Sequence, residues 1–111
     1  MTILHSVQGT RIVVAINGDL DLKTAGPLRD TLDTLIDRYP DKHLILDLAE
    51  VGFIDSSGLG VILGRYRRLG QNQRTLTLSG VKPSVRTVLD LAGILSIITV
   101  IESPARKEIQ R

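Results

Sequence analysis

The chain has 111 residues, a formal charge of +2 and no cysteine, and 42% of its residues are hydrophobic but only 3% aromatic. A chain of this length is expected to form one domain, residues 1–111, around an aliphatic core. Without cysteine there is no disulfide framework, no thiolate nucleophile and no cysteine zinc site. No apolar run approaches the ~20 residues that a membrane span requires, and the first residues lack the pattern of a signal peptide. We therefore expect a soluble, cytoplasmic protein.

Charge is distributed unevenly along the chain. Residues 1–55 carry a net charge of −4, whereas residues 56–111 carry a net charge of +6. The stretch between Ser56 and Leu89 contains no acid, and its cations are Arg65, Arg67, Arg68, Arg74, Lys82 and Arg86. Such cations suit a solvated helix face or a surface for an acidic partner. Nucleic acid is disfavoured, because only Tyr66 is available among them to stack on bases.

The first half of the chain predicts a β-hairpin, a helix and a buried strand. Thr2–Val7 and Arg11–Asn17 are alternating or β-branched segments around a Gln-Gly-Thr turn, which is typical of antiparallel strands. Gly18–Asp21 breaks this pattern, and apolar residues then recur at helical spacing from Thr24 to Tyr39. The apolar run His43–Ala49 predicts a buried strand.

The second half of the chain predicts alternating helices and strands. Ser57–Leu69 and Pro83–Leu91 have helical periodicity. Arg74–Ser79 alternates like a strand exposed on one face, and Ile97–Ile101 predicts a last strand. Glu102–Arg111 is polar and suits a frayed tail or a terminal helical turn.

Strands that alternate with helices pair in parallel through right-handed crossovers, and the first hairpin adds one antiparallel strand. The sequence therefore predicts an α/β fold of α+β-like character. Its mixed sheet is expected to have four or five strands, with an N-terminal hairpin and three to four helices packed on it.

A polar cluster, Asp55–Ser57, stands directly before the second predicted helix. All three residues are good N-cap types, so helix capping alone explains their presence. Capping does not explain three glycines within the same predicted helix, each of which costs ~1 kcal/mol relative to alanine. These glycines are Gly58, Gly60 and Gly64.

Gly60 and Gly64 lie four residues apart, and with Val61 they are expected to form a surface of small groups. The expected core stripe on the other side comprises Leu59, Ile62, Leu63 and Tyr66. A surface of small groups lets another polypeptide approach the helix backbone. Close packing within the domain is the alternative explanation.

Ser56 also suits phosphorylation, because the N–H groups and dipole of a helix start tolerate a phosphate. A charge near −2 would then appear on the surface without refolding of the chain. Asp55 is adjacent in sequence. Asp19 and Asp21 form a second acidic turn that would reach the same rim if the strand ends align. The sequence therefore predicts a switch that acts by contact with a partner.

The residues from Asp55 to Tyr66 read Asp-Ser-Ser-Gly-Leu-Gly-Val-Ile-Leu-Gly-Arg-Tyr. This run resembles the signature of the STAS-domain anti-sigma factor antagonists, and most closely their sporulation branch. Gly18–Asp21 is similar to the family's Gly-acid-Leu-Asp turn, although Asp19 stands where the sporulation branch usually has Glu. Leu44–Leu48 is similar to the family's central strand.

The resemblance implies a STAS fold and a protein that is not an enzyme and has no cofactor. Its unphosphorylated form would bind an anti-sigma factor that is also an ATP-dependent serine kinase, and would thereby release a sporulation sigma factor. That kinase would phosphorylate Ser56, with Ser57 the less favoured acceptor, and a phosphatase would restore binding.

The residues expected to contact the partner are Asp19, Asp21, Asp55, Ser57, Gly58, Leu59, Gly60, Val61 and Gly64. We expect a monomer that binds neither DNA nor a membrane.

Other functional classes fit the residues less well. Ser56 lacks a Gly-x-Ser-x-Gly elbow, because position 54 is Ile, and the candidate bases are limited to His5 and His43. No phosphate-loop Lys follows the glycines, and two isolated histidines offer no metal-ligand spacing. The alternative that we retain is a STAS interaction module of a general stress-response or stressosome pathway, or a lipid-transport subunit.

Overall fold

The computed structural model describes residues 1–102, so the expected tail, apart from Glu102, lies outside the described residues. The strands are β1 (Thr2–Gln8), β2 (Arg11–Asn17), β3 (His43–Glu50), β4 (Leu76–Ser79) and β5 (Val100–Ile101). The helices are α1 (Leu22–Arg38), α2 (Ser56–Gly70), α3 (Pro83–Leu91) and the short 3₁₀ helix η1 (Ile94–Ser96).

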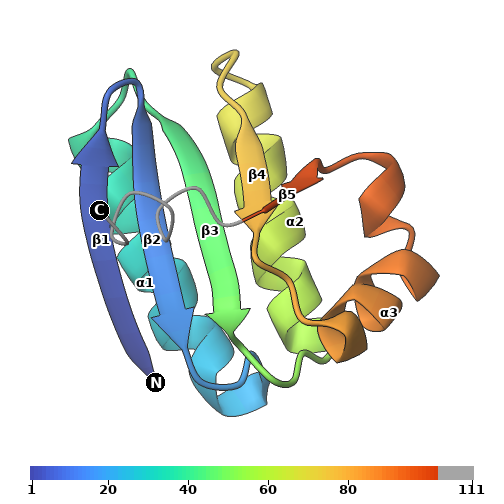
Figure 1. Cartoon of the computed structure of the whole chain (residues 1–111). Coiled ribbons are helices and arrows are strands. Elements are labelled where there is room, and N and C mark those ends of the chain that lie inside the picture. The colour runs from blue at the N-terminus through green and yellow to red at the C-terminus, as the bar shows by residue number, and fades with distance from the viewer. Residues whose placement is uncertain (103–111) are drawn as a thin grey trace.

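The five strands form one mixed sheet in the order β1-β2-β3-β4-β5. β1 is antiparallel to β2, and each later pair of neighbours is parallel. Figure 1 shows α1 and α2 side by side across one face of the sheet, with α3 beyond β4. These features confirm the predicted α/β fold with a mixed sheet and an N-terminal hairpin. None of the described helices is long and apolar enough to cross a membrane.

The main core lies between the sheet and the helices, and strand periodicity selects the side chains that enter it. Alternate residues of a strand point to the same face, so Val14 of β2 lies beside Leu46 of β3, which lies beside Leu78 of β4. The largest fully buried side chains are all Leu or Ile, as the composition predicts. They are Ile12, Ile16, Leu20, Leu28, Leu32, Ile36, Leu44, Leu46, Leu48, Ile62, Leu69 and Leu78.

Three elements differ from the sequence prediction. α1 begins at Leu22 and not at Thr24, because the preceding Asp21 caps it. β4 is shorter than the predicted 74–79 and begins at Leu76, and its second face is less exposed than expected, because Thr77 is partly buried and Ser79 fully buried. The expected strand at 97–101 is confined to its last two residues, because the chain first forms η1 and then buries Ile98 in the core.

The inward face of α2 is also rotated from the expected one. Its buried residues are Gly58, Val61, Ile62 and Leu69. The expected core residues Leu59, Leu63 and Tyr66 are only partly buried. Val61 is only 7% exposed and is part of the hydrophobic core. The expectation that Val61 lies with the glycines on an outward surface is therefore wrong.

Candidate functional site: the paired helix starts

The amino-terminal ends of α1 and α2 are joined through a backbone bridge. The two segments that follow β2 and β3 continue to run parallel, and Leu20 of the first pairs with Ile54 of the second. The N–H of Leu20 donates to the Phe53 oxygen at 2.9 Å, and the N–H of Asp55 donates to the Leu20 oxygen at 3.0 Å. This register aligns the turn that contains Asp21 with the one that contains Asp55. We call the edge formed by residues 18–24 and 52–60 the Ser56 rim.

Asp21 holds the start of α1. Its carboxylate accepts hydrogen bonds from the N–H groups of Lys23 at 3.0 Å and Thr24 at 3.1 Å. The Thr24 hydroxyl accepts from the N–H of Asp21 at 3.0 Å and donates to the Asp19 carbonyl at 2.7 Å. This reciprocal capping box satisfies donors that the first helical turn leaves free. Asp19 supplies a carbonyl to the box, and its side chain is exposed.

Asp55 holds the start of α2 in a similar way. Its carboxylate accepts from the N–H groups of Ser57 at 2.8 Å and Gly58 at 3.2 Å. Of the three candidate caps, Asp55 is therefore the N-cap, and Ser56 is the first helical residue. Ser56 is exposed, whereas Ser57 is partly buried.

Gly58 is needed for the close packing of α2 on the neighbouring turn. A Cβ at this position would lie 2.7 Å from both the Leu20 Cβ and the Leu20 carbonyl oxygen, and 2.9 Å from Cγ1 of Ile54. Because backbone and buried atoms form these contacts, a side chain at this position would force α2 away from the segment that contains Leu20. Close packing within the fold therefore explains Gly58.

Internal packing does not explain the other two glycines of the motif. A Cβ at Gly60 or at Gly64 would meet nothing within 4 Å among the atoms outside the local helix. Gly60 is exposed and Gly64 partly exposed. Of the two explanations that the sequence left open, the structure removes close internal packing at these positions. The remaining explanation, access of another chain to the helix backbone, stays a prediction.

Two large apolar residues of the Ser56 rim escaped the sequence analysis. Phe53 is 52% exposed and Leu22 is 79% exposed, and neither belongs to the buried core. Leu22 precedes the helix that the sequence predicts from Thr24, and Phe53 lies in none of the predicted elements, so the sequence pattern assigns neither residue a role. The signal that identifies Phe53 is its pairing: Ile54 points inward beside Leu20, which turns the preceding side chain outward.

Half of the cations in the acid-free stretch have partners inside the molecule. Arg68 donates to Asp33 at 3.0 Å and also to Asp37, and hydrogen bonding to Asp37 raises its pKa. Arg65 Nε lies 3.2 Å from the Asp33 carboxylate, although too misaligned for a hydrogen bond. These contacts join α2 to α1.

Arg74 caps the other end of α1. Its guanidinium donates to the backbone oxygens of Ile36 at 3.3 Å, Tyr39 at 3.1 Å and Lys42 at 3.4 Å. Cations at a helix carboxyl end are favourable because they bind carbonyls that lack helical partners. A partner surface built from the whole arginine-rich stretch is therefore not available.

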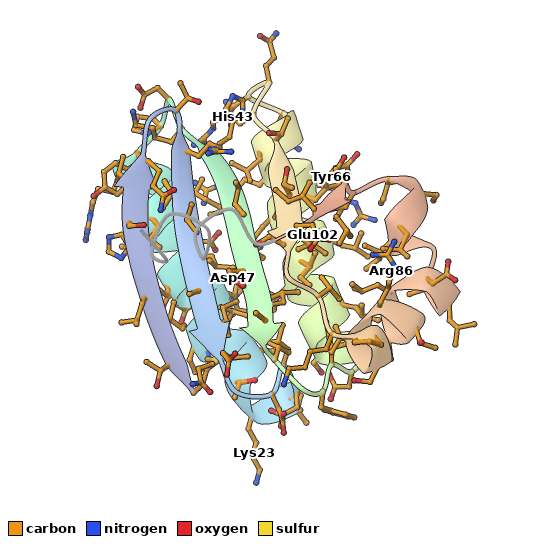
Figure 2. The ribbon with its side chains drawn as sticks, in the orientation of Figure 1. Lys23, His43, Asp47, Tyr66, Arg86 and Glu102 are labelled. Atoms are coloured by element: carbon orange, nitrogen blue, oxygen red, sulfur yellow. The ribbon has the colours of Figure 1, made fainter. Side chains whose placement is uncertain are left out.

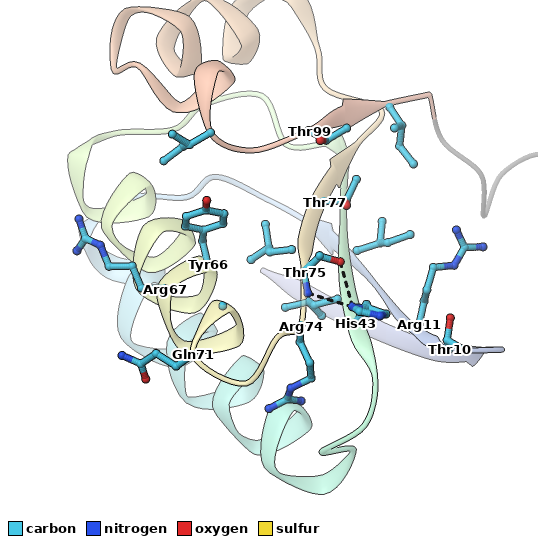
Figure 3. Close-up of a pocket in the computed structure, with 16 residues that line it drawn as sticks. Thr10, Arg11, His43, Tyr66, Arg67, Gln71, Arg74, Thr75, Thr77 and Thr99 are labelled. Atoms are coloured by element: carbon cyan, nitrogen blue, oxygen red, sulfur yellow. Dashed lines mark hydrogen bonds between the residues drawn. The ribbon is translucent and has the colours of Figure 1, made fainter.

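A cavity of about 900 Å³ lies at the opposite end of the molecule from the Ser56 rim. Its walls include Arg11, His43, Tyr66, Arg67 and Thr75, and His43 Nδ1 accepts from the N–H of Thr75 at 3.0 Å (Figure 3). Figure 2 shows His43 and Lys23, the latter at the start of α1, at opposite ends of the molecule. No residue of the Ser56 rim lines this cavity.

The Ser56 rim has the chemistry of a binding surface. The described residues contain no group of three side chains able to hold a metal ion. His43 lies at the cavity end, and the ring of His5 lies 6.5 Å from that of Tyr39, which ends α1. Neither histidine is therefore placed to activate Ser56. The rim instead presents an exposed hydroxyl, acidic turns and apolar side chains on two joined helix starts.

A family model described as "STAS domain" matches residues 3–106. The chain belongs to the STAS domain family. It is 36% identical over 92 residues to the "Anti-sigma F factor antagonist" of Paenibacillus polymyxa, covering 83% of this chain and 79% of that protein. It is 32% identical over 92 residues to the "Anti-sigma-B factor antagonist" of Listeria monocytogenes, covering 80% and 77%.

Solved structures share the fold. The unphosphorylated form of the anti-sigma factor antagonist SpoIIAA superposes with a TM-score of 0.81 at 24% identity, covering 99% of this chain and 95% of that one. A putative anti-sigma factor antagonist from Thermotoga maritima gives a TM-score of 0.85 at 21% identity, covering 98% and 95%.

Proposed function

We propose that this protein is an anti-sigma factor antagonist that is switched off by phosphorylation of Ser56. In this proposal the unphosphorylated Ser56 rim binds an anti-sigma factor with serine kinase activity and releases a sporulation-type sigma factor. A phosphatase restores the binding form. The protein acts by binding and does not itself catalyse a reaction. The observation that carries the proposal is the exposed Ser56 hydroxyl at the first position of α2, between Asp55 and the exposed Gly60.

Exposure favours Ser56 over Ser57 as the acceptor. A kinase must reach the hydroxyl, and Ser56 is exposed whereas Ser57 is partly buried. The Ser57 N–H is also held by the Asp55 carboxylate at 2.8 Å. A phosphate on Ser57 would therefore crowd the existing cap, whereas one on Ser56 would point from the helix start toward solvent or a partner.

The capping geometry favours a switch by contact. Asp55 already occupies two donors of the first turn of α2, the N–H groups of Ser57 and Gly58. A phosphate on Ser56 would gain little new hydrogen bonding there, and the nearby carboxylate would repel it. The added bulk and charge would thus disrupt a close-packed partner contact at Ser56, because burying a phosphate there without enough hydrogen-bond partners is costly. A few kcal/mol lost at such a contact lowers affinity by a hundredfold or more.

The names of the relatives and the run Val61–Tyr66 support a sigma-regulating role. One relative is named as an antagonist of the anti-sigma F factor and another as an antagonist of the anti-sigma-B factor. The sporulation branch is favoured because the Val-Ile-Leu-Gly-Arg-Tyr run resembles it and because the F antagonist matches at 36% identity against 32%. The stress-response assignment is the second candidate, supported by the B antagonist.

The experiment pairs the full chain with the anti-sigma F factor of P. polymyxa and Mg-ATP. We expect phosphate on Ser56 by mass spectrometry of the peptide containing residues 53–60. Ser57→Ala should still be modified, whereas Ser56→Ala should bind and not be released. Ser56→Asp should bind at least about tenfold more weakly, because its charge mimics part of the phosphate.

Two results would contradict the proposal. If the wild-type protein binds neither this anti-sigma F factor nor the corresponding anti-sigma-B factor, it is not an antagonist of either branch. Phosphate found outside residues 53–60, or equal affinity of Ser56→Ala and Ser56→Asp, would show that charge at Ser56 is not the switch.

A further inference from the structure

Phe53 is a large apolar residue that is exposed on the Ser56 rim. It is the chain's one phenylalanine, and it is 52% exposed. Its backbone oxygen accepts the Leu20 N–H at 2.9 Å, so its backbone position on the Ser56 rim is fixed by the bridge between the two segments. A large aromatic side chain exposed beside other apolar groups is typical of a contact site.

Leu22 extends this apolar surface from the neighbouring segment of the rim. It is the first residue of α1, it is 79% exposed, and it follows the cap residue Asp21 directly. The pairing of Leu20 with Ile54 brings the segments that carry Leu22 and Phe53 to the same rim. Apolar side chains from both segments of the rim thus flank Ser56.

The acids of the same rim define the charge of the partner. Asp19 is exposed beside this apolar pair, Asp21 and Asp55 cap the two helices, and Lys23 is the one cation of the rim. No ion pair to any of these three acids is found among residues 1–102, so the rim carries an excess of negative charge. A partner that covers this surface is complementary to it if it supplies apolar contact together with positive charge, above all opposite the exposed Asp19.

We infer that Phe53 and Leu22 are the apolar anchors for the partner, and that the partner presents an apolar pocket bordered by Lys or Arg. This inference rests on the proposed function, because it takes the anti-sigma factor as the occupant. It adds two contact residues to those implied by the family signature. Phe53 inserts as the central anchor, and Leu22 packs at its edge beside the acidic turns.

Leu91 provides a matched control. It is also a large exposed residue, at 85%, but it ends α3, outside the Ser56 rim. Leu91→Ala removes a comparable apolar area from the surface and leaves the Ser56 rim unchanged. A general effect of surface hydrophobicity on binding would therefore appear equally in Leu91→Ala and Leu22→Ala.

The test measures the affinity of full-length variants for the P. polymyxa anti-sigma F factor by calorimetry, with thermal melting of each variant. Phe53→Ala should weaken binding by about tenfold or more and Leu22→Ala by about threefold, with Leu91→Ala close to wild type. All three should melt close to wild type, because all three residues are exposed and none belongs to the buried core. The Phe53→Ala loss should persist in high salt, since apolar contact is not screened.

Charge substitutions at the same position test the partner's sign. Phe53→Arg should bind more weakly than Phe53→Glu, because both lose the anchor but only the arginine is repelled by a basic border. This comparison also keeps the test valid if Phe53→Ala melts early. Phe53→Arg and Phe53→Glu are compared with each other at a temperature at which both are folded.

The outcomes separate this inference from the proposed function. If wild type and Leu91→Ala both fail to bind, the proposed function fails for this factor and the inference fails with it. If both bind and Phe53→Ala binds as Leu91→Ala does, the anchor assignment alone is overturned. If Phe53→Glu binds more weakly than Phe53→Arg, the basic border is wrong.

Discussion

At the scale of single residues, Gly58 and Gly60 lie two positions apart in α2 but have entirely different surroundings. A Cβ at Gly58 would lie 2.7 Å from the Leu20 backbone oxygen, whereas one at Gly60 would meet nothing within 4 Å. Gly58→Ala should therefore destabilise the protein by ~1–2 kcal/mol, because overpacking outweighs the gain in helix propensity. Gly60→Ala should stabilise it by ~1 kcal/mol, because only the propensity changes. Thermal or urea unfolding of the two variants measures both effects.

The two substitutions serve as controls for each other, because they add the same methyl group to the same helix. A Gly58→Ala variant as stable as Gly60→Ala would mean that α2 moves away from Leu20 without cost. That result would remove the structural reason for Gly58. Leucine at Gly60 then tests its exposed side: the fold should remain stable and partner binding should fall.

At the scale of elements, α1 and α2 are joined by charged side chains. Arg68 is bound by Asp33 and Asp37, and the pKa of Arg68 is raised mainly by hydrogen bonding to Asp37. Arg65 has a side chain only 13% exposed and lies beside the same Asp33. Asp33→Asn should therefore destabilise the protein by ~1 kcal/mol, equivalent to a melting temperature ~4 °C lower.

Asp30 on the same helix offers the control for this prediction. Its pair with Arg29 is largely exposed, at 54% and 75% for the two side chains, and pairs of this kind contribute little. Asp30→Asn should thus leave the melting temperature nearly unchanged. Equal loss in both variants would indicate a general charge effect on α1, and the ion pairs to α2 would then have no special role.

Local patterns predicted most elements because their periods are present in neighbouring residues. The β-branched, apolar run Arg11–Asn17 and the helical spacing within Ser57–Leu69 are two such cases. Features that depend on distant residues were missed or misplaced. Val61 is part of the buried core, and Phe53 faces outward because Ile54 pairs with Leu20. The acidic turns could be assigned to one rim only if the ends of two strands aligned, and the backbone bridge supplies that alignment.

At the scale of the whole molecule, the charge division along the sequence becomes a division between two ends. Arg65 and Arg68 lie against acids of α1, so these two cations of the positive half are balanced internally. Asp19 remains exposed on the Ser56 rim, while Arg67 lines the cavity at the far end. A basic partner would therefore approach the Ser56 rim first, and the far end would contribute little at physiological salt.

This arrangement predicts how salt affects association with the anti-sigma factor. Raising NaCl from about 50 to about 300 mM should slow the association rate of wild type severalfold, because the attraction between acidic rim and basic partner is screened. Asp19→Asn should associate more slowly at low salt and show a weaker salt dependence. Arg67→Gln changes the net charge by the same magnitude but lies about 16 Å along α2 from Ser56, beyond the screening length, and should behave as wild type. Stopped-flow measurements decide the matter: a larger effect of Arg67→Gln than of Asp19→Asn would place the encounter surface at the cavity end.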